Sequence, residues 1–269
     1  MKRLIAASIA VLFTGATVAQ EVIAQPPQAV VSKVSSMFEG QAQAIKYFTA
    51  PDNLIAIGVV TRDFKQQVYY TNQTGDFVLS GMMYDVNAKV NFNNEVIAQV
   101  PVELPETLTA GIQDLPAAIH GEGEQVVYAI VDANCGYCKR FYQKIESQMA
   151  AGQLTNVSVK YIPVGMLGQD SKVKAEAIMS LPEAERFAAL QAAVNRQPIT
   201  MTTSEEGQSL VAQNKAFMDQ FPFISGVPFV LTQLNGEWRM DRGLPNDGWF
   251  TMLAQVANPT PPTAATTGN

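Results

Sequence analysis

The sequence predicts two globular parts, a small α+β domain followed by a larger α/β domain. The chain has 269 residues, which is long for one domain, and 47% of them are hydrophobic, enough to fill two cores. Short β-rich runs dominate up to about residue 92, whereas the chain after residue 124 alternates apolar strands with helical patterns. This change of pattern indicates the order of the two domains.

Residues 1–19 have the features of a secretory signal peptide. A basic start with Lys2 and Arg3 precedes the apolar run LIAASIAVLF, and small residues then lead to Ala19. The run is shorter than the roughly 20 residues that a membrane-spanning helix needs, which favours cleavage over anchoring. Without Lys2 and Arg3 the 18 basic residues fall to 16 against 24 acidic ones, a net charge of −8. That charge disfavours nucleic acid as a partner.

Residues 20–100 are expected to form the α+β domain. Apolar residues at helical spacing between Pro26 and Gly40 predict an amphipathic helix. Turn signals then separate short β-rich runs, which predicts an antiparallel meander packed on that helix. The runs are residues 54–61, 66–70, 77–85 and 88–92.

Residues 101–123 are expected to form a linker helix and a hinge. About one apolar residue per turn predicts the helix, and Gly121-Glu122-Gly123 predicts the hinge. His120 would end this helix as a surface or hinge residue. The apolar positions are Leu108, Ile112, Leu115 and Ile119.

The pattern of strands and helices over residues 124–257 predicts an α/β domain. A buried strand at 126–131, a tight loop, a helix and a second strand at 157–164 form a βαβ unit. Helical patterns at 171–195 and 204–220 read as an insertion, before a hairpin and a closing helix. The hairpin strands are expected at 228–233 and 238–241 and the helix at 247–256. The Pro- and Thr-rich tail, residues 258–269, is expected to be disordered.

The chain has only two cysteines, Cys135 and Cys138, and they lie on either side of Gly136 and Tyr137. An exported protein meets an oxidising compartment, but cysteines three residues apart cannot join distant parts of a fold. At the start of a helix, unpaired backbone N–H groups and the helix dipole favour the thiolate of the first cysteine, with Asn134 expected to cap the helix. Cys135 is therefore the predicted nucleophile.

Cys138 is predicted to resolve the intermediate that Cys135 forms. It lies nearly one turn on, deeper on the same helix face, where it could attack a mixed disulfide at Cys135. The alternative for the pair is an inert small-loop disulfide. A strand, a Cys-x-x-Cys and a helix in an exported chain favour the redox role.

The residue counts argue against metal and hydrolase chemistry. Two thiols and one imidazole, His120, leave a structural zinc site short of ligands. A Ser-His or Cys-His hydrolase meets the same shortage of histidine. No metal and no cofactor are expected.

In the order of its parts and in several local segments, the chain resembles the DsbC/DsbG family of periplasmic disulfide isomerases. The resemblance covers nearly all of the chain after the signal peptide. The segments that carry it are Met82-Met83-Tyr84-Asp85, Asp132 to Cys138 (DANCGYC), Ile162-Pro163-Val164-Gly165, Gly226-Val227-Pro228 and Gly243-Leu244-Pro245.

This resemblance implies a cystatin-like N-terminal dimerisation domain and a thioredoxin-like catalytic domain with a helical insertion. It implies a V-shaped homodimer that acts on misfolded or oxidised exported proteins and is kept reduced by a DsbD-like membrane reductase. Pro228 would follow a cis peptide bond against the cysteines, and the backbone of Val227 would bind a substrate strand.

Three departures from the family pattern leave the preferred reaction open. The chain lacks the second cysteine pair of DsbC, has Gly136 where DsbG-like proteins usually have Pro, and has Val227 where both branches commonly have Thr. Val at that position is more typical of the oxidase DsbA. The leading hypothesis is disulfide isomerase and reductase activity, and the alternatives are reduction of protein sulfenic acids and thiol-independent chaperone activity.

Overall fold

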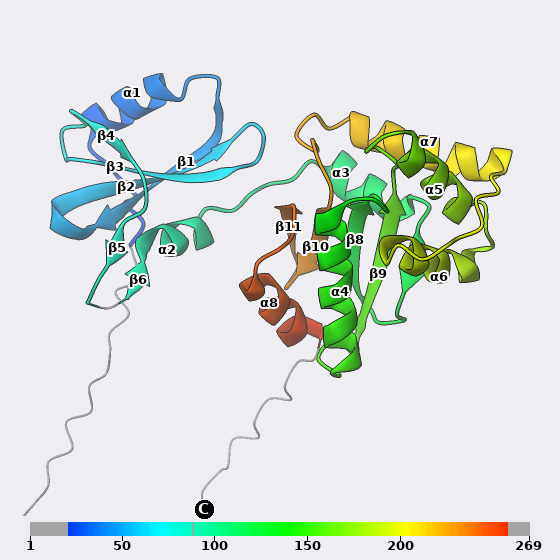
Figure 1. The fold of residues 1–269 in the computed structure, drawn as a ribbon. Helices are drawn as coiled ribbons and strands as arrows, with labels where there is room; N and C mark the ends of the chain where they lie inside the picture. Colours follow the sequence, from blue (N-terminus) through cyan, green and yellow to red (C-terminus); the bar gives the residue numbers. More distant parts are fainter. Residues whose placement is uncertain (1–20, 88, 258–269) are drawn as a thin grey trace, which may run out of the picture. The chain divides into compact units, whose positions relative to one another are not determined.

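The protein is described from a computed structural model that covers residues 21–87 and 89–257. The expected signal peptide, residues 1–19, and the expected disordered tail, residues 258–269, lie outside the described residues. The chain divides into two compact units after Val102 (Figure 1). Within the described ranges no helix is both long and apolar enough to cross a bilayer.

The first unit is built on an antiparallel sheet of four strands in the order β1-β2-β3-β4. The predicted runs at 54–61, 66–70 and 77–85 correspond to β2, β3 and β4, whereas β1 is not among the predicted strands and the run at 88–92 lies outside this sheet. Helix α1 packs on one face, where Val30 and Val34 meet Ile55 and Ile57 of β2. The elements are α1 (Gln28–Met37), β1 (Ala42–Ala50), the 3-10 turn η1 (Pro51–Asn53), β2 (Leu54–Thr61), β3 (Gln66–Thr71), β4 (Val78–Ser80), and a small ladder of β5 (Tyr84–Asp85) and β6 (Val90–Asn91).

Helix α2 (Phe92–Ala98) covers the other face of this sheet, where Val96 packs with Ala56 and Val60. The sequence analysis predicts a strand over residues 88–92 and assigns no element to residues 93–98, so this helix corrects that prediction. The side chain of Asn91 accepts a hydrogen bond from the backbone N–H of Asn93 at 3.0 Å and so caps the new helix. Strand β6 therefore ends at Asn91.

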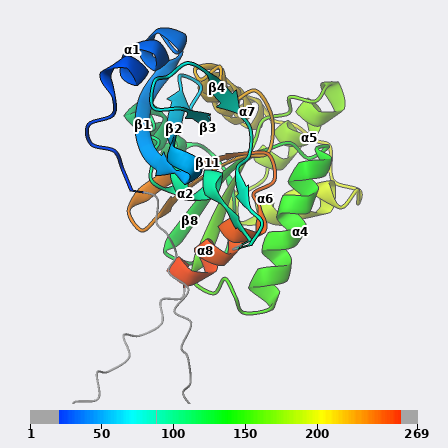
Figure 2. The same ribbon diagram turned by 90° about the vertical axis from the view of Figure 1, so that its left-hand side faces the viewer.

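The second unit is a five-stranded mixed sheet in the order β11-β10-β8-β9-β7 with helices on both faces (Figures 1 and 2). Strands β8 and β9 are parallel, and the other pairs are antiparallel. The strands are β7 (Ala118–His120), β8 (Gln125–Val131), β9 (Val157–Pro163), β10 (Phe229–Leu234) and β11 (Glu237–Arg242). The helices are α3 (Glu106–Gly111), α4 (Gly136–Ala150), α5 (Gln169–Met179), α6 (Glu183–Val194), α7 (Glu205–Asp219) and α8 (Asp247–Ala257).

From Val127 to Val131 strand β8 has only apolar and aromatic residues, in keeping with the burial of both its faces there. Val127, Ala129 and Val131 belong to the core formed with α4 and α8. Tyr128 and Ile130 belong to the opposite core, formed with α3 and α7. The cysteine loop at the end of β8 thus starts from a strand that is held on both sides.

The predicted linker helix is wrong beyond Asp114. Helix α3 ends at Gly111, a 3-10 turn (η2, Ile112–Asp114) follows, and Leu115 is extended because it precedes Pro116. Residues 118–120 then form β7, an edge strand antiparallel to β9. Leu108, Ile112 and Leu115 are buried as predicted, whereas Ile119, on the edge strand, is 38% exposed.

The two glycines of the expected hinge lie instead in a tight turn against β9. A Cβ atom on Gly121 would lie 2.5 Å from the carbonyl oxygen of Val157, and one on Gly123 would lie 2.0 Å from the carbonyl carbon of Asn156. The backbone N–H of Gln125 donates to the carbonyl of Asn156 at 3.0 Å. Close backbone contact explains the glycines here, and no hinge is needed.

We predict that Gly123→Ala destabilises the second unit by about 1–3 kcal/mol, since the added methyl group meets backbone that cannot move aside. Gly136→Ala is the matched control, because a Cβ there meets nothing within 4 Å, and its effect should stay within about 0.5 kcal/mol. Urea unfolding followed by tryptophan fluorescence measures both. Equal stability of the two variants would contradict this reading of the turn.

Candidate active site

The cysteine loop joins the end of β8 to the start of α4. Cys135 is the N-cap residue of α4, and its sulfur accepts a hydrogen bond from the backbone N–H of Cys138 at 3.3 Å. Asn134 was expected to cap the helix, and that expectation is wrong. Its side-chain amide instead donates to Asp170 at 2.8 Å and accepts from Lys174 at 2.8 Å. These partners are 36 and 40 residues away along the chain, so the local sequence does not indicate them.

Both cysteines are free thiols, and their surroundings differ. The Cys135 side chain borders a surface pocket and donates its S–H to the carbonyl of Val227 at 3.3 Å. Cys138 lies inside, with 2% of its surface exposed, and burial raises the pKa of its thiol well above the ordinary value. Cys138 therefore keeps its proton at neutral pH, whereas Cys135, although only 7% exposed, borders a pocket.

The loop before β10 lies against the cysteines. The peptide bond between Val227 and Pro228 is cis, as the family resemblance implies. Val227 packs between the two cores of this unit and also borders a groove of about 500 Å³. Of the predicted site residues, Cys135 and Val227 are thus in direct contact, and Tyr137 reaches the same groove.

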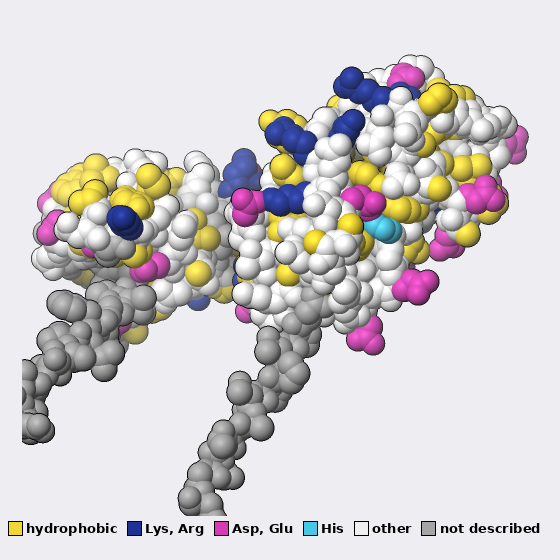
Figure 3. Space-filling view, turned by 60° about the horizontal axis from the view of Figure 1, so that its bottom comes forward, with side chains coloured by type: hydrophobic (Ala, Val, Ile, Leu, Met, Phe, Trp, Pro, Cys, Tyr) yellow, Lys and Arg dark blue, Asp and Glu magenta, His cyan; other side chains and the backbone are white. Residues whose placement is uncertain are grey.

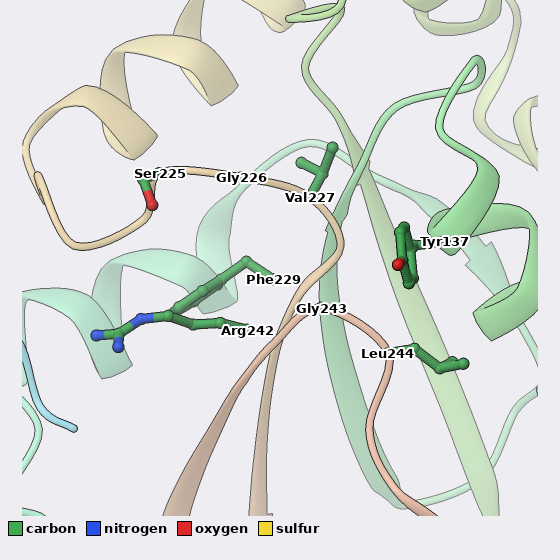
Figure 4. A pocket seen from close by; sticks show the side chains of 8 residues that line it. All are labelled: Tyr137, Ser225, Gly226, Val227, Phe229, Arg242, Gly243 and Leu244. Carbon is green, nitrogen blue, oxygen red and sulfur yellow. The ribbon is translucent and has the colours of Figure 1, made fainter. Parts of the chain in front are cut away.

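Figure 4 shows this groove, which we call the Tyr137 groove. Its residues come from helix α4, from the loop before β10, from the start of β10, and from the end of β11 and the segment after it. Tyr137 and Leu244 lie on the same side of the groove. Tyr137 is 56% exposed, and the guanidinium of Arg140 lies 4.2 Å from its ring centroid, a cation–π contact. Gly136 is exposed and lines a different pocket, on the Asn134 side.

Asp132 holds the loop in place, a role that the sequence analysis did not assign. Its side chain is 1% exposed and accepts hydrogen bonds from the backbone of Asn134 at 2.9 Å, of Met166 at 2.8 Å and of Leu167 at 3.0 Å. The hydroxyl of Ser171 donates a further bond. The signal in the sequence was an acidic residue at the end of a buried strand, but its partners lie up to 39 residues away.

His120, the last residue of β7, lies beside Glu146 of helix α4, and Glu146 is more than two helical turns after the cysteines. Its Nδ1 atom is 2.9 Å from a carboxylate oxygen of Glu146, and its ring stacks on Phe187 at 4.1 Å. Figure 3 shows the histidine, in cyan, at the surface next to an acidic side chain. Burial lowers the pKa of His120, and the charge of Glu146 partly offsets that. Among the described residues no three His, Cys, Asp or Glu side chains are grouped to hold a metal ion.

A central sheet with β8 parallel to β9, a Cys-x-x-Cys at the start of the helix between them, and a cis-proline opposite the first cysteine together define a thioredoxin-like fold. The α/β class predicted for the second unit is confirmed. No family model matches the chain.

Two curated relatives are similar to the chain. The thiol:disulfide interchange protein DsbG of Pseudomonas aeruginosa is 23% identical over 174 residues, which is 64% of this chain and 66% of the relative. The DsbG protein of Escherichia coli is 24% identical over 189 residues, 65% of this chain and 71% of the relative. The chain is thus similar to two DsbG proteins, in agreement with the resemblance to the DsbC/DsbG family that its sequence shows.

Solved structures give weaker matches. Proteus mirabilis ScsC in a compact conformation is 17% identical with a TM-score of 0.46, over 57% of this chain and 80% of that one. A disulfide interchange protein from Neisseria gonorrhoeae is 20% identical with a TM-score of 0.41, over 52% of this chain and 94% of that one.

We predict that the two thiols of the reduced protein differ in alkylation rate and in pH dependence. At neutral pH, Cys135 in a Cys138→Ala variant should react with iodoacetamide at least about tenfold faster than Cys138 in a Cys135→Ala variant. Because a raised pKa keeps the thiol protonated, the rate at Cys138 should rise only above the pH range of ordinary thiols. Both variants should label equally in denaturant, and equal rates in the folded state would contradict the assignment.

Proposed function

We propose that this protein is a periplasmic thiol:disulfide interchange protein, a disulfide isomerase and reductase that acts on exported proteins through Cys135 and Cys138. The observation that carries the proposal is the asymmetry of the pair. One thiol borders a pocket at a helix start beside a cis-proline loop, and the other is enclosed and protonated. The names of the two curated relatives support the same activity.

The reaction begins with attack of the Cys135 thiolate on one sulfur of a substrate disulfide. The substrate S–S bond breaks, a new S–S bond joins Cys135 to the substrate, and the other substrate sulfur leaves as a thiolate that takes up a proton. In isomerisation, a substrate thiolate then attacks the mixed disulfide, forms a different substrate disulfide and releases Cys135 unchanged. The redox state of the protein is the same before and after.

In reduction, the sulfur of Cys138 attacks Cys135 instead. The substrate leaves as a free thiol, and Cys135 and Cys138 are left joined as a disulfide. Cys138 must lose its proton for this step, and the hydrogen-bond contact between the side chains of Cys138 and Cys135 places its sulfur within reach. Two electrons must then be returned to the pair, so we propose a DsbD-like membrane reductase as partner.

The loop before β10 and the Tyr137 groove supply the proposed substrate site. The backbone of Val227 next to Pro228 can hydrogen-bond an extended chain in the manner of an added strand, and its carbonyl already accepts from Cys135. Apolar side chains, among them Val227, Phe229 and Leu244, line the groove. Such a lining suits the exposed apolar segments of a misfolded protein.

We propose further that the first unit joins two copies into a homodimer. Around β4 and β5 it exposes large apolar side chains, which in a soluble monomer usually mark an interaction surface. They are Phe77 (43%), Leu79 (52%), Met82 (69%), Tyr84 (47%) and Val86 (76%).

Reduction of protein sulfenic acids is the second candidate. It is the alternative that the resemblance to DsbG-like proteins implies, and both curated relatives carry the name DsbG. Cys135 would attack the sulfenic sulfur, displace hydroxide and form a mixed disulfide, which Cys138 resolves to leave a substrate thiol. This route uses the same two residues and differs only in the oxidised group attacked.

We predict that the pre-reduced protein restores native activity to a scrambled, multi-disulfide substrate, whereas Cys135→Ala gives the uncatalysed rate. The reason is that every step passes through a covalent bond to the Cys135 sulfur. A sulfenylated single-cysteine protein, assayed in parallel, separates the two candidate substrates. Recovery by Cys135→Ala at the wild-type rate would contradict the proposal, and suppression of aggregation without thiol exchange would favour a chaperone.

A further inference from the structure

A second hollow, of about 260 Å³, lies on the Asn134 side of Cys135, and we call it the side pocket. Its lining includes the sulfur-bearing residue Cys135 itself, together with Asn134, Lys139, Asp170 and Arg196. Charged and polar side chains thus line the side pocket, whereas mainly apolar ones line the Tyr137 groove. A substrate attached to Cys135 has a different surface on each side of its cysteine.

The charges of the side pocket do not cancel. Asp170 accepts hydrogen bonds from Asn134 and from Lys174, whose Nζ lies 2.6 Å away, and these contacts hold the pKa of Asp170 below its usual value. Asp170 and Lys174 therefore neutralise each other. Within the described ranges no carboxylate lies within ion-pair distance of Lys139 or Arg196. Lys139 and Arg196 thus line the pocket that Cys135 also borders, and neither is paired with a carboxylate of the described residues.

The backbone at Arg196 supports a functional reason for that side chain. Arg196 follows the end of α6, its φ angle is +60°, and its N–H donates to the carbonyl of Ala193 at 3.0 Å. This left-handed conformation favours glycine or asparagine, and a residue with a longer side chain is disfavoured there. Arg196 thus occupies a disfavoured backbone position while lining the pocket that Cys135 borders, and such an outlier points to a use of its side chain.

We infer that the side pocket receives the carboxylate of an aspartate or glutamate that flanks the attacked cysteine of the substrate protein. The inference rests on the proposed function. Because Cys135 borders the side pocket and also contacts Val227 at the edge of the Tyr137 groove, a chain bonded to its sulfur passes both surfaces. Lys139 and Arg196 attract an acidic neighbour of the substrate cysteine and repel a basic one.

Single-cysteine peptides, each joined by a disulfide to neutral 2-thiopyridine, test this directly. Attack by Cys135 on the peptide sulfur breaks that disulfide, joins the peptide to Cys135 and releases the absorbing thiopyridone. Glu, Gln and Lys are placed in turn at each position that flanks the cysteine. At low salt we expect the Glu peptide to react about fivefold faster than the Gln peptide at one or more positions, with the Lys peptide slowest, and added salt should shrink the difference.

Two variants assign the preference to the side pocket. Arg196→Gly removes the charge while giving the backbone the residue that its conformation favours, so the fold is retained, and Lys139→Gln removes the second charge from the surface of α4. Each should lower the Glu-to-Gln rate ratio toward one. Lys215→Gln, which removes one charge from α7 where Lys215 pairs with Asp219, is the matched control and should keep the wild-type ratio.

Equal rates for the three peptides at every position would contradict the inference, and so would a wild-type ratio in both Arg196→Gly and Lys139→Gln. The Gln peptide separates this failure from failure of the proposed function. If it reacts with the wild-type protein and not with Cys135→Ala, thiol exchange stands and only the side pocket is wrongly assigned. If no peptide reacts, the proposed function fails and the inference fails with it.

Discussion

The geometry of the site depends on the hydrogen bonds of one buried side chain, Asp132. Burying a carboxyl group without partners is costly, and Asp132 meets four donors, from its own loop, from the segment after β9 and from the first turn of α5. These bonds fix the turn between β8 and α4. Cys135 is consequently held at the start of α4 and within 3.3 Å of the Val227 carbonyl.

The position of this turn gives the two cysteines different surroundings. Cys135, with 7% of its surface exposed, borders the side pocket, and its sulfur accepts an N–H from the first turn of α4. Cys138, three residues on, is drawn into the core between α4 and the sheet, where burial raises the pKa of its thiol. The proposed mechanism needs one thiol that attacks the substrate disulfide and a second, more enclosed thiol close to it that later releases the substrate.

Local patterns were sufficient to predict the redox pair, the strand before it, the helix after it and most elements of the second unit. The failures share a physical cause, which is competition from contacts distant in sequence. Asn134 does not cap α4 because Asp170 and Lys174 bind its amide. Residues 118–120 leave the helical pattern because Pro116 breaks it and the edge of β9 offers unpaired backbone groups. The side pocket could not be predicted for the same reason, since only the fold brings Arg196 and Cys135 to the lining of one pocket.

The central claim is that Cys135 attacks and Cys138 resolves, and trapping the intermediate tests it most directly. Reduced Cys138→Ser and Cys135→Ser proteins are each mixed with an oxidised multi-disulfide substrate, quenched with acid and analysed by mass spectrometry without reductant. The account predicts a one-to-one mixed disulfide through Cys135 in the Cys138→Ser protein and little adduct in the Cys135→Ser protein. An adduct of equal yield through Cys138, or none with either variant, would contradict it.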